Sequence, residues 1–351
     1  MEVLASVQYE KLEQIGVGQG RNSLVFKARD RLGRIVAVKE LAMADLDAQG
    51  LSDYYQEAKS LFAAQHDNVV PIHYACETDT HVGLVMPLFA KGCLADRIAA
   101  GPLRLREVVR VAHGMLHGLA RIHIANLVHF DVKPSNVLFS DRDEPMVADF
   151  GQARLMDEAG TAPAPRIYPW CFPPEAFVQG VGIVESDIYQ VGLTLYRAVN
   201  GDPYFRDQLA DLGTDEAIRD AIELGSLVDR DRFMPHVPNG LRRVIRRALH
   251  PECTERYHSA TEMADALASV ALPHDWVVSS DGATLSWHCE PAGRTHLVVI
   301  MTPCHQVGRW AVEVYTDGKV GRRKKEPGRF WKAGLTSLQA ERHLRGVFTS
   351  L

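Results

Sequence analysis

The sequence lacks the features of membrane-spanning, secreted and low-complexity proteins. No apolar run reaches the length of about 20 residues that a membrane-spanning helix needs. The first residues, MEVLASVQYEKLEQ, do not show the basic start and apolar core of a secretory signal. The 6 cysteines are scattered and form no CxxC pair, which argues against a disulfide framework. We therefore expect a reduced, cytoplasmic protein without a membrane segment.

Charge is unevenly distributed along the 351 residues. Residues 1–271 contain 28 Lys and Arg against 37 Asp and Glu, a net charge of −9. Residues 272–351 contain 11 against 7, a net charge of +4, and the two values sum to the overall −5. We predict from this asymmetry that residues 272–351 form a separate unit with a different partner.

Apolar spacing divides the longer, acidic part of the chain into a strand-rich and a helix-rich portion. Residues 9–41 read as three strands joined by turns. Apolar residues recur at steps of three and four over residues 105–124, which predicts a long buried helix. We expect an α+β fold with two lobes, a β-rich one at about 9–89 and a helical one at about 90–271.

The segment LVHFDVKPSNVLF, residues 127–139, places an acid, a base and an amide inside a strand-like stretch. A strand that only packs against a core needs none of Asp131, Lys133 and Asn136. A buried carboxylate is costly unless its charge is compensated. The segment therefore predicts a partner that is cationic, phosphorylated or both.

Further elements accompany this segment along the chain. Glycines in a turn between strands let the backbone approach phosphates closely, and a lysine at the end of VAVK can anchor phosphates with a helix glutamate as its counter-ion. A second carboxylate, in DFG, again follows a strand. The elements are Gly16, Gly18 and Gly20, then Lys39, Glu57, Asp149, Pro174-Glu175, Asp187, Gly192 and Arg256.

In this order the elements resemble the eukaryotic-type serine/threonine protein kinase family, over about residues 9–271. The resemblance implies a bilobal protein kinase-like fold and transfer of the γ-phosphate of ATP to hydroxyls of protein substrates, including the chain itself. Asp131 would accept or orient the substrate hydroxyl proton, and Lys133 would neutralise the γ-phosphate. Lys39 would bind the α- and β-phosphates.

The resemblance also implies a nucleotide and metal site. Asn136 and Asp149 would hold Mg²⁺, with Mn²⁺ as an alternative, because hard oxygen ligands suit such ions. Glu57 would pair with Lys39, and the three glycines would cover the phosphates. The other residues expected to contact ATP are Val25, Ala37, Met86, Pro87, Phe89 and Leu138.

Phe130 departs from the family pattern, which usually has an arginine before the catalytic aspartate. Because that arginine commonly pairs with a phosphate on the activation loop, we predict activity that does not require loop phosphorylation. Thr161 and Tyr168 are the only hydroxyl residues between Asp149 and Glu175, so they are the candidate autophosphorylation sites.

Two other segments depart from the pattern. The glycine loop has two extra residues before Val25, so we expect an altered nucleotide affinity. The segment before Glu175 lacks the usual Gly-Thr dipeptide, whereas Lys133 within KPSN favours serine and threonine over tyrosine as acceptors.

The resemblance assigns structural roles to several residues near the site. Asp187 would brace the backbone of the catalytic loop. His129 and Phe150 would pack with Leu61 and Ile72 as a core stack that links the lobes, and we do not expect His129 to act as a general base.

Residues 272–351 read as a small α+β domain, with four short strands at hairpin spacing and a closing helix. Its basic residues surround two aromatics, which leaves three alternatives open: a solvated hairpin edge, an acidic protein partner or the kinase lobe, and nucleic acid. These residues are Arg322, Arg323, Lys324, Lys325, Arg329 and Lys332 around Phe330 and Trp331.

A zinc site is a further alternative for this domain. His288-Cys289 and Cys304-His305 mirror each other across a predicted hairpin and supply four suitable ligands. Adjacent strand residues point to opposite faces, however, so the four side chains converge only if the strand is bulged.

Our interpretation is an ATP- and Mg²⁺-dependent serine/threonine protein kinase with a C-terminal accessory domain. A pseudokinase scaffold is one alternative, although every catalytic position is filled. A small-molecule phosphotransferase is another, but the PPE segment, Asp187 and Arg256 fit a peptide-binding lobe better. A toxin or defence kinase is a third, and the HFD and VADFG motifs look more bacterial than animal.

Overall fold

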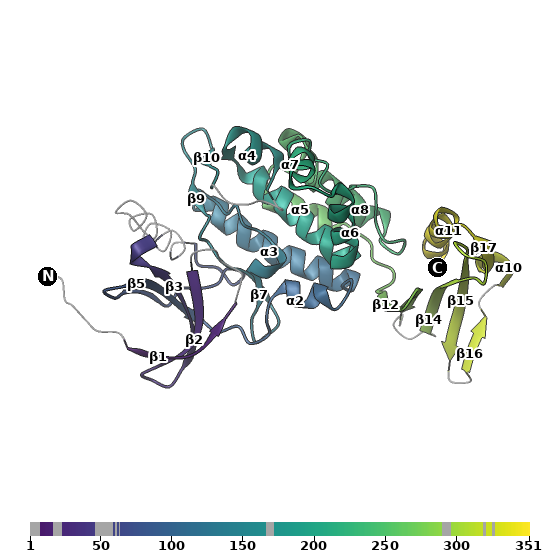
Figure 1. Ribbon diagram of the computed structural model, residues 1–351, viewed down its shortest axis with the longest axis horizontal. Coiled ribbons are helices and arrows are strands. Elements are labelled where there is room, and N and C mark those ends of the chain that lie inside the picture. Colours follow the sequence, from purple (N-terminus) through teal and green to yellow (C-terminus); the bar gives the residue numbers. More distant parts are fainter. Residues whose placement is uncertain are drawn as a thin grey trace. The chain divides into compact units, whose positions relative to one another are not determined.

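The chain forms two compact units, which are described in turn. The first comprises residues 1–95, 114–190 and 259–261, and the second comprises residues 96–113, 191–258 and 262–351. A computed structural model (Figure 1) describes residues 8–16, 23–45, 59, 62, 64–165, 172–289, 296–318, 321–324 and 327–351.

The first unit begins with a five-stranded antiparallel sheet. The strand order is β1 (Tyr9–Ile15), β2 (Ser23–Asp30), β3 (Ile35–Ala42), β5 (His81–Pro87) and β4 (Tyr74–Glu77). A short 3-10 turn, η1 (Met43–Asp45), follows β3. The three strands expected over residues 9–41 are therefore confirmed.

The two faces of this sheet carry different residues, because side chains alternate along a strand. One face forms a core cluster of Ala28, Val36, Val38 and Val85. Register places Val25 opposite Lys39, and Ala37 opposite Met86, so these residues lie on the other face. The pattern separates the packing residues of the sheet from its candidate site residues.

The rest of the first unit consists of short strands, turns, one short helix, the end of one long helix and the beginning of another. This part of the unit contains three two-stranded sheets: β6 with β9, β7 with β8, and β10 with β11. Their bounds are β6 (Leu127–Val128), β7 (Val137–Phe139), β8 (Pro145–Val147), β9 (Arg154–Leu155), β10 (Ala162–Pro163) and β11 (Val181–Gly182), with η2 (Pro134–Asn136) before β7 and α4 (Pro174–Gln179) before β11.

The long helix predicted from apolar spacing is confirmed as α3 (Leu105–Ile124). Its fully buried residues recur every three or four positions and include Val108, Ala112, Met115, Leu119 and Ile122. The other helical elements are α2 (Leu94–Ala99), α5 (Val184–Asn200), α6 (Asp202–Leu212), α7 (Asp215–Glu223), α8 (Asn239–Ala248), η3 (Cys253–Glu255) and α9 (Ala260–Ala268). Among the described residues, no helix combines the length and apolar character needed to cross a membrane.

A second antiparallel sheet occupies the C-terminal part of the second unit. The predicted strands are present as β12 (Val277–Asp281), β13 (Thr284–Cys289), β14 (His296–Pro303) and β15 (Trp310–Gly318), and the closing helix as α11 (Ser337–Ser350). Three elements were not predicted: β16 (Gly321–Lys324), β17 (Lys332–Leu335) and the short α10 (Pro327–Phe330). Strands β16 and β17 both pair with β15, so part of the basic segment forms a sheet edge.

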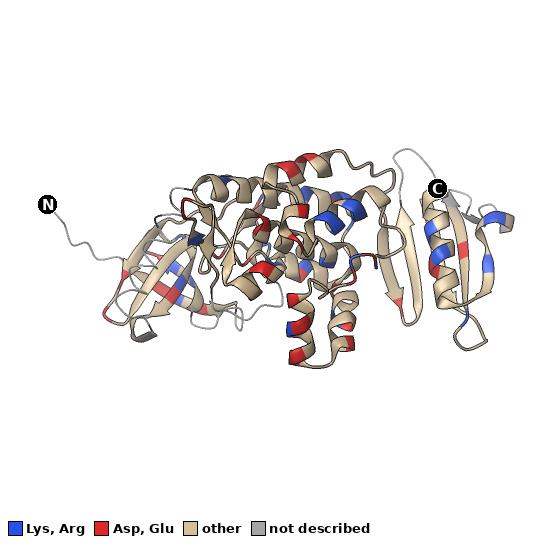
Figure 2. Ribbon diagram, turned by 90° about the horizontal axis from the view of Figure 1, so that it is seen from above, with Lys and Arg blue, Asp and Glu red and all other residues tan. Residues whose placement is uncertain are grey.

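Helix α11 lies beside β15 and β17 (Figure 1). It begins with a capping box, in which Thr336 and Gln339 satisfy each other's backbone N–H groups. Helix α11 and the C-terminal sheet carry residues of both signs, as the N-terminal sheet does (Figure 2).

The mirrored arrangement that suggested a zinc site is wrong. Cys289 at the end of β13 pairs with Leu297 at the beginning of β14, whereas Cys304 follows the other end of β14. The two cysteines therefore lie at opposite ends of the hairpin. Over the described part of the chain, no group of three or more His, Cys, Asp and Glu side chains is arranged to hold a metal ion.

The C-terminal sheet is attached to the helical part of its unit by an aromatic anchor, formed by His236, Trp276, Trp287 and Phe348. The ring of Phe348 lies 5.1 Å from Trp276, 5.5 Å from Trp287 and 6.1 Å from His236 between centroids. Trp287 is fully buried and its indole Nε1 donates to His236 Nδ1 at 3.2 Å. Burial lowers the pKa of His236 to about 3, so this imidazole is neutral and accepts the hydrogen bond.

Candidate active site

The catalytic loop brings together the acid, base and amide singled out in the sequence. One carboxylate oxygen of Asp131, Oδ2, accepts from Lys133 Nζ at 2.8 Å and from Asn136 Nδ2 at 2.8 Å. Asn136 Nδ2 also donates to the Asp131 carbonyl at 2.9 Å, which fixes the orientation of the amide. Because the nitrogen of the amide is used in this way, its oxygen is the atom left to accept from a ligand or coordinate a cation.

The loop takes this shape because helix α5 supplies polar contacts to its backbone. Asp187 is fully buried, and its carboxylate accepts from the backbone N–H of His129 at 2.8 Å and of Phe130 at 2.9 Å. Three residues further along the same helix, Gln190 accepts from Val132 N at 2.9 Å and donates to Phe130 O at 2.7 Å. The bracing role predicted for Asp187 is confirmed, and Gln190 extends it.

Phe130 adopts a left-handed backbone conformation, with φ of 63°. Such a conformation costs of order 1–3 kcal/mol in a residue other than glycine and persists only where the surroundings enforce it. Here Asp187 and Gln190 hold both the N–H and the carbonyl of Phe130. The conformation turns the chain so that Asp131 follows directly at the site.

Lys39 and Asp149 form an ion pair between the N-terminal sheet and the DFG segment. Lys39 Nζ lies 2.5 Å from Asp149 Oδ1, and the two side chains are 16% and 35% exposed. Gly151 N also donates to Asp149 Oδ1, at 3.3 Å. Burial alone would raise the pKa of Asp149, but the Lys39 ammonium and these hydrogen bonds lower it to about 2. Asp149 is therefore ionised at neutral pH.

Three of the residues expected to contact ATP pack around one buried cluster. Met86, Phe89 and Leu138 pack against a cluster of Val70, Met146 and Ala148. Ala37 and Val25 lie on the same sheet face as Met86 and Lys39, and Pro87 ends β5. These side chains are apolar, and their contact with ATP stays a prediction.

Several predicted residues lie outside the described part of the chain. These are Gly18, Gly20, Glu57, Leu61 and Tyr168. Gly16, the first of the three glycines, is described and follows β1 with φ of 65°, in the region that favours glycine.

The predicted stack of His129 on Phe150 is confirmed, with ring centroids 4.8 Å apart. His129 is fully buried, and burial lowers the pKa of its imidazole. Its Nδ1 accepts from the backbone N–H of Asp131 at 3.2 Å. A buried, neutral ring in such a contact positions the loop, in agreement with the structural role expected for it. Ile72 packs with a cluster of Val82 and Leu84 in the N-terminal sheet.

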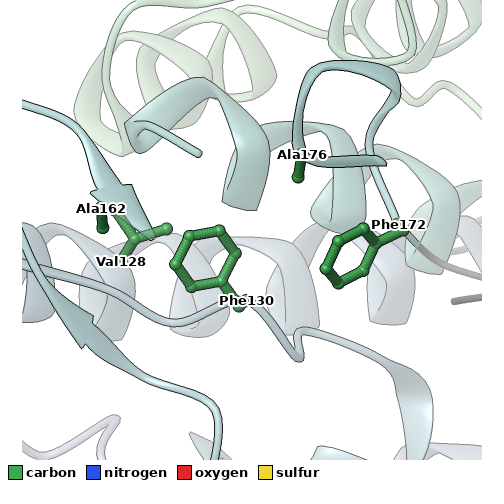
Figure 3. Close-up of a cluster of buried hydrophobic side chains, with 5 residues drawn as sticks. All are labelled: Val128, Phe130, Ala162, Phe172 and Ala176. Atoms are coloured by element: carbon green, nitrogen blue, oxygen red, sulfur yellow. The ribbon is translucent and has the colours of Figure 1, made fainter. Parts of the chain in front are cut away.

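The side chain of Phe130 has a role that the sequence did not indicate. It forms an apolar cluster with Val128, Ala162, Phe172 and Ala176, in which Met156 and Phe177 also pack (Figure 3). Ala162 belongs to β10 and Ala176 to α4, so the cluster joins both described ends of the activation segment to the catalytic loop. An added Cβ on Gly182 would lie 2.2 Å from the Phe130 ring, which shows how closely β11 approaches it.

The donor set suits a divalent cation bound with phosphates. Asp149 offers an ionised carboxylate, and Asn136 offers an amide oxygen whose orientation is fixed by Asp131. These are the hard oxygen ligands that Mg²⁺ prefers, and such sites usually leave several positions for phosphate oxygens and water. Lys39 and Lys133 add two cationic groups for the phosphates.

Comparison with known proteins agrees with this arrangement. The protein kinase domain matches residues 9–277. The chain is 30% identical over 266 residues to the serine/threonine-protein kinase PknL of Mycobacterium bovis, which covers 74% of this chain and 65% of PknL. It is 30% identical over 275 residues to the serine/threonine-protein kinase pkn2 of Myxococcus xanthus, which covers 75% of this chain and 32% of that protein.

A third relative is a probable serine/threonine-protein kinase of Clostridium acetobutylicum, 27% identical over 274 residues, with 76% of this chain and 40% of that protein covered. The chain therefore spans less than two thirds of the length of these relatives. The family match covers most of this chain and includes all the residues of the site described above. The chain belongs to the protein kinase family.

Proposed function

We propose that this chain transfers the γ-phosphoryl group of ATP to serine and threonine hydroxyls of protein substrates, with Mg²⁺. The observation that carries the proposal is the Asp131 carboxylate, held by both Lys133 and Asn136. Phosphoryl transfer depends on positioning and charge neutralisation rather than on a protein nucleophile, and this group of side chains supplies both.

Each residue has a separate task in the proposed reaction. Asp131 orients the acceptor hydroxyl and takes its proton, while Lys133, hydrogen-bonded to the same carboxylate, neutralises charge on the transferred group. Lys39 binds the α- and β-phosphates. Asn136 and Asp149 would hold Mg²⁺, which would supply positive charge to offset the negative charge of the phosphates.

The acceptor class rests on Lys133 within KPSN and on the similarity to relatives named serine/threonine-protein kinases. We further propose that the catalytic domain ends near residue 271 and that residues 272–351 are an accessory domain. Binding of an acidic protein or nucleic acid at the basic edge of this domain stays a prediction. The cytoplasm stays the predicted location of the chain.

The proposal is tested by incubating the purified chain with radiolabelled ATP, Mg²⁺ and generic acceptor proteins, followed by phosphoamino acid analysis. Asp131→Asn is the matched control, because it keeps the shape of the side chain and removes its basicity. We expect phosphoserine or phosphothreonine from the wild type, and a rate about 10³-fold lower from the variant.

Other results of this experiment would contradict parts of the proposal. Phosphotyrosine would overturn the acceptor class. Unlabelled protein together with intact ATP binding would favour a pseudokinase scaffold. Label found only on an added small-molecule alcohol would favour a small-molecule phosphotransferase.

A further inference from the structure

Thr161 closes a tight turn in the activation segment through the carboxylate of Asp157. Asp157 Oδ1 accepts from the backbone N–H groups of Ala159 and Thr161, each at 2.9 Å. Asp157 Oδ2 accepts from the Thr161 hydroxyl at 2.8 Å. The hydrogen bonds from Thr161 lower the pKa of Asp157, so its carboxylate is ionised and fully engaged by the turn.

The turn is linked directly to the apolar cluster around Phe130. Ala162, the residue after Thr161, is 1% exposed and belongs to that cluster. It pairs with Gly182 of β11, and Gly182 lies against the ring of Phe130. On the other side of the turn, the backbone N–H of Met156 donates to the Asn126 carbonyl, and the side-chain amide of Asn126 donates to the Met156 carbonyl. A change at Thr161 therefore acts on the segment that packs against the catalytic loop (Figure 3).

A phosphate on Thr161 would lie beside a group of the same charge, the carboxylate of Asp157. It would remove the hydroxyl donor and add a charge of about −1.5 to −2 beside an ionised carboxylate, an arrangement that disrupts by repulsion. The position before Asp131, where the family commonly has an arginine for a loop phosphate, is the buried Phe130. Among the described residues, no Lys or Arg forms an ion pair with Asp157 that would compensate this charge.

We propose that Thr161 is an inhibitory phosphorylation site, whose modification opens the turn and lowers phosphotransfer. The phosphoryl group comes from the activity proposed above, on which this inference rests, acting between two copies of the chain. The bond between Pγ and the β–γ bridging oxygen of ATP breaks, and a bond forms from Pγ to Thr161 Oγ1. The hydroxyl proton passes to Asp131 of the copy that acts as kinase, and ADP leaves.

The test compares Thr161→Glu with Thr161→Val in the full chain. The glutamate introduces the negative charge, whereas the valine removes the hydroxyl with little change of shape. We expect Thr161→Glu to lower kcat/KM for a protein acceptor about tenfold, the scale of one close like-charge contact at a protein surface. Thr161→Val is expected to stay within about twofold, because both backbone donors to Asp157 remain.

A second substitution separates repulsion from simple loss of structure. Asp157→Asn keeps an oxygen for the two backbone N–H groups and removes the charge. In the Asp157→Asn, Thr161→Glu double variant, kcat/KM is expected to return to within about threefold of the Asp157→Asn single variant. An equal loss of kcat/KM in Thr161→Glu and in the Asp157→Asn, Thr161→Glu double variant would overturn the proposed repulsion.

Hydrogen exchange provides a measurement that does not depend on phosphotransfer. We expect the amides of Ala159, Thr161 and Ala164 to exchange at least about tenfold faster in Thr161→Glu than in Thr161→Val. This comparison distinguishes failure of the inference from failure of the proposed function, because it applies equally to an inactive chain. Unchanged exchange would overturn the inference.

Mass spectrometry after incubation with ATP and Mg²⁺ completes the test. Phosphate on Thr161, together with a falling rate toward the acceptor, supports the proposal. A rising rate as Thr161 becomes phosphorylated would overturn it, as would labelling of the acceptor protein without any phosphate on Thr161.

Discussion

The catalytic loop and the C-terminal sheet are each held by buried side chains of a helical region, but the chemistry of the two attachments differs. Asp187 and Gln190 hold the loop through four hydrogen bonds: Asp187 accepts two from backbone N–H groups, and Gln190 accepts one from a backbone N–H and donates one to a backbone carbonyl. Asp187 also forms a hydrogen bond with His123 of helix α3. The sheet is held by the aromatic anchor, with one hydrogen bond between Trp287 and His236.

This difference corresponds to what each attachment must do. Hydrogen bonds are directional, so a buried carboxylate fixes the position of individual backbone atoms, and with them the side chain of Asp131. Aromatic packing has preferred ring geometries, but it stabilises mainly in proportion to the apolar area buried and fixes no individual backbone atom. We therefore expect damage to the first attachment to affect both stability and activity, and damage to the second to affect stability alone.

The largest effect is expected from Asp187→Ala. The substitution leaves the N–H groups of His129 and Phe130, and the ring of His123, without their buried acceptor. We expect the free energy of unfolding to fall by about 4 kcal/mol and kcat/KM to fall at least about a hundredfold. Urea denaturation and acceptor phosphorylation measure the two quantities.

Asp231→Ala is the matched control for this substitution. Asp231 forms a surface ion pair with Arg246, in which the two side chains are 69% and 51% exposed. Its loss is expected to change the free energy of unfolding by less than about 0.5 kcal/mol, because exposed ion pairs contribute little. Full activity in a stable Asp187→Ala protein would contradict the positioning role of the buried carboxylate.

A smaller effect, confined to stability, is expected from Trp287→Ala. Removing this buried ring from the aromatic anchor should lower the free energy of unfolding by about 3 kcal/mol, with kcat/KM within about twofold of the wild type. Trp287→Phe keeps most of the apolar area but removes the donor to His236, so about 1 kcal/mol should be lost. Loss of activity in the folded Trp287→Phe protein would contradict the expectation that damage to the aromatic anchor affects stability alone.

The smallest effect concerns the Lys39–Asp149 pair and is seen in its pH dependence. The folded-state pKa of Asp149 is about 2 against an ordinary value of 3.8, so its stabilising contribution is present above 3.8 and lost as the pH falls to about 2. Because the carboxylate is partly exposed, the contribution is about 1 kcal/mol after solvent screening.

Lys39→Met tests the cause of this shift. Without the ammonium, burial dominates, and the pKa of Asp149 is expected to rise above 3.8. Carboxyl NMR titration measures the value in both proteins. An unchanged pKa in the variant would show that the hydrogen bond from Gly151, and not Lys39, determines the ionisation of Asp149.

Much of the fold followed from local patterns. Helix α3 begins and ends at the residues predicted, because its apolar stripe is continuous and its core positions are all buried. The grouping of Asp131, Lys133 and Asn136 was also predictable, since the three lie within one short turn. Local sequence was enough to predict these elements, although helix α5 also holds the backbone of the catalytic loop in its shape.

Other elements depend on contacts that no local pattern encodes. Strand β16 consists of glycine and basic residues, a composition that does not predict a strand, and it is a strand because β15 pairs with it. Helix α6 begins with Asp202-Pro203, and its bounds were not predicted, since its burial of Phe205 and Gln208 is set by tertiary packing. The sequence also showed that Phe130 lacks an arginine's function, but not that its ring packs against the activation segment.

The fit of Phe130 beneath the activation segment offers a route to chemical control. Phe130→Ala would leave a void the size of a benzene ring, lined by Val128, Ala162 and Phe172. Apolar cavities of this kind stay dry and take up small aromatic compounds. We expect indole or toluene to restore phosphotransfer in Phe130→Ala and to leave the wild type unchanged. The measurement is the acceptor labelling rate as a function of compound concentration. The cavity left by Phe130→Ala would then bind an externally added ligand, and the activity of the enzyme would depend on that ligand.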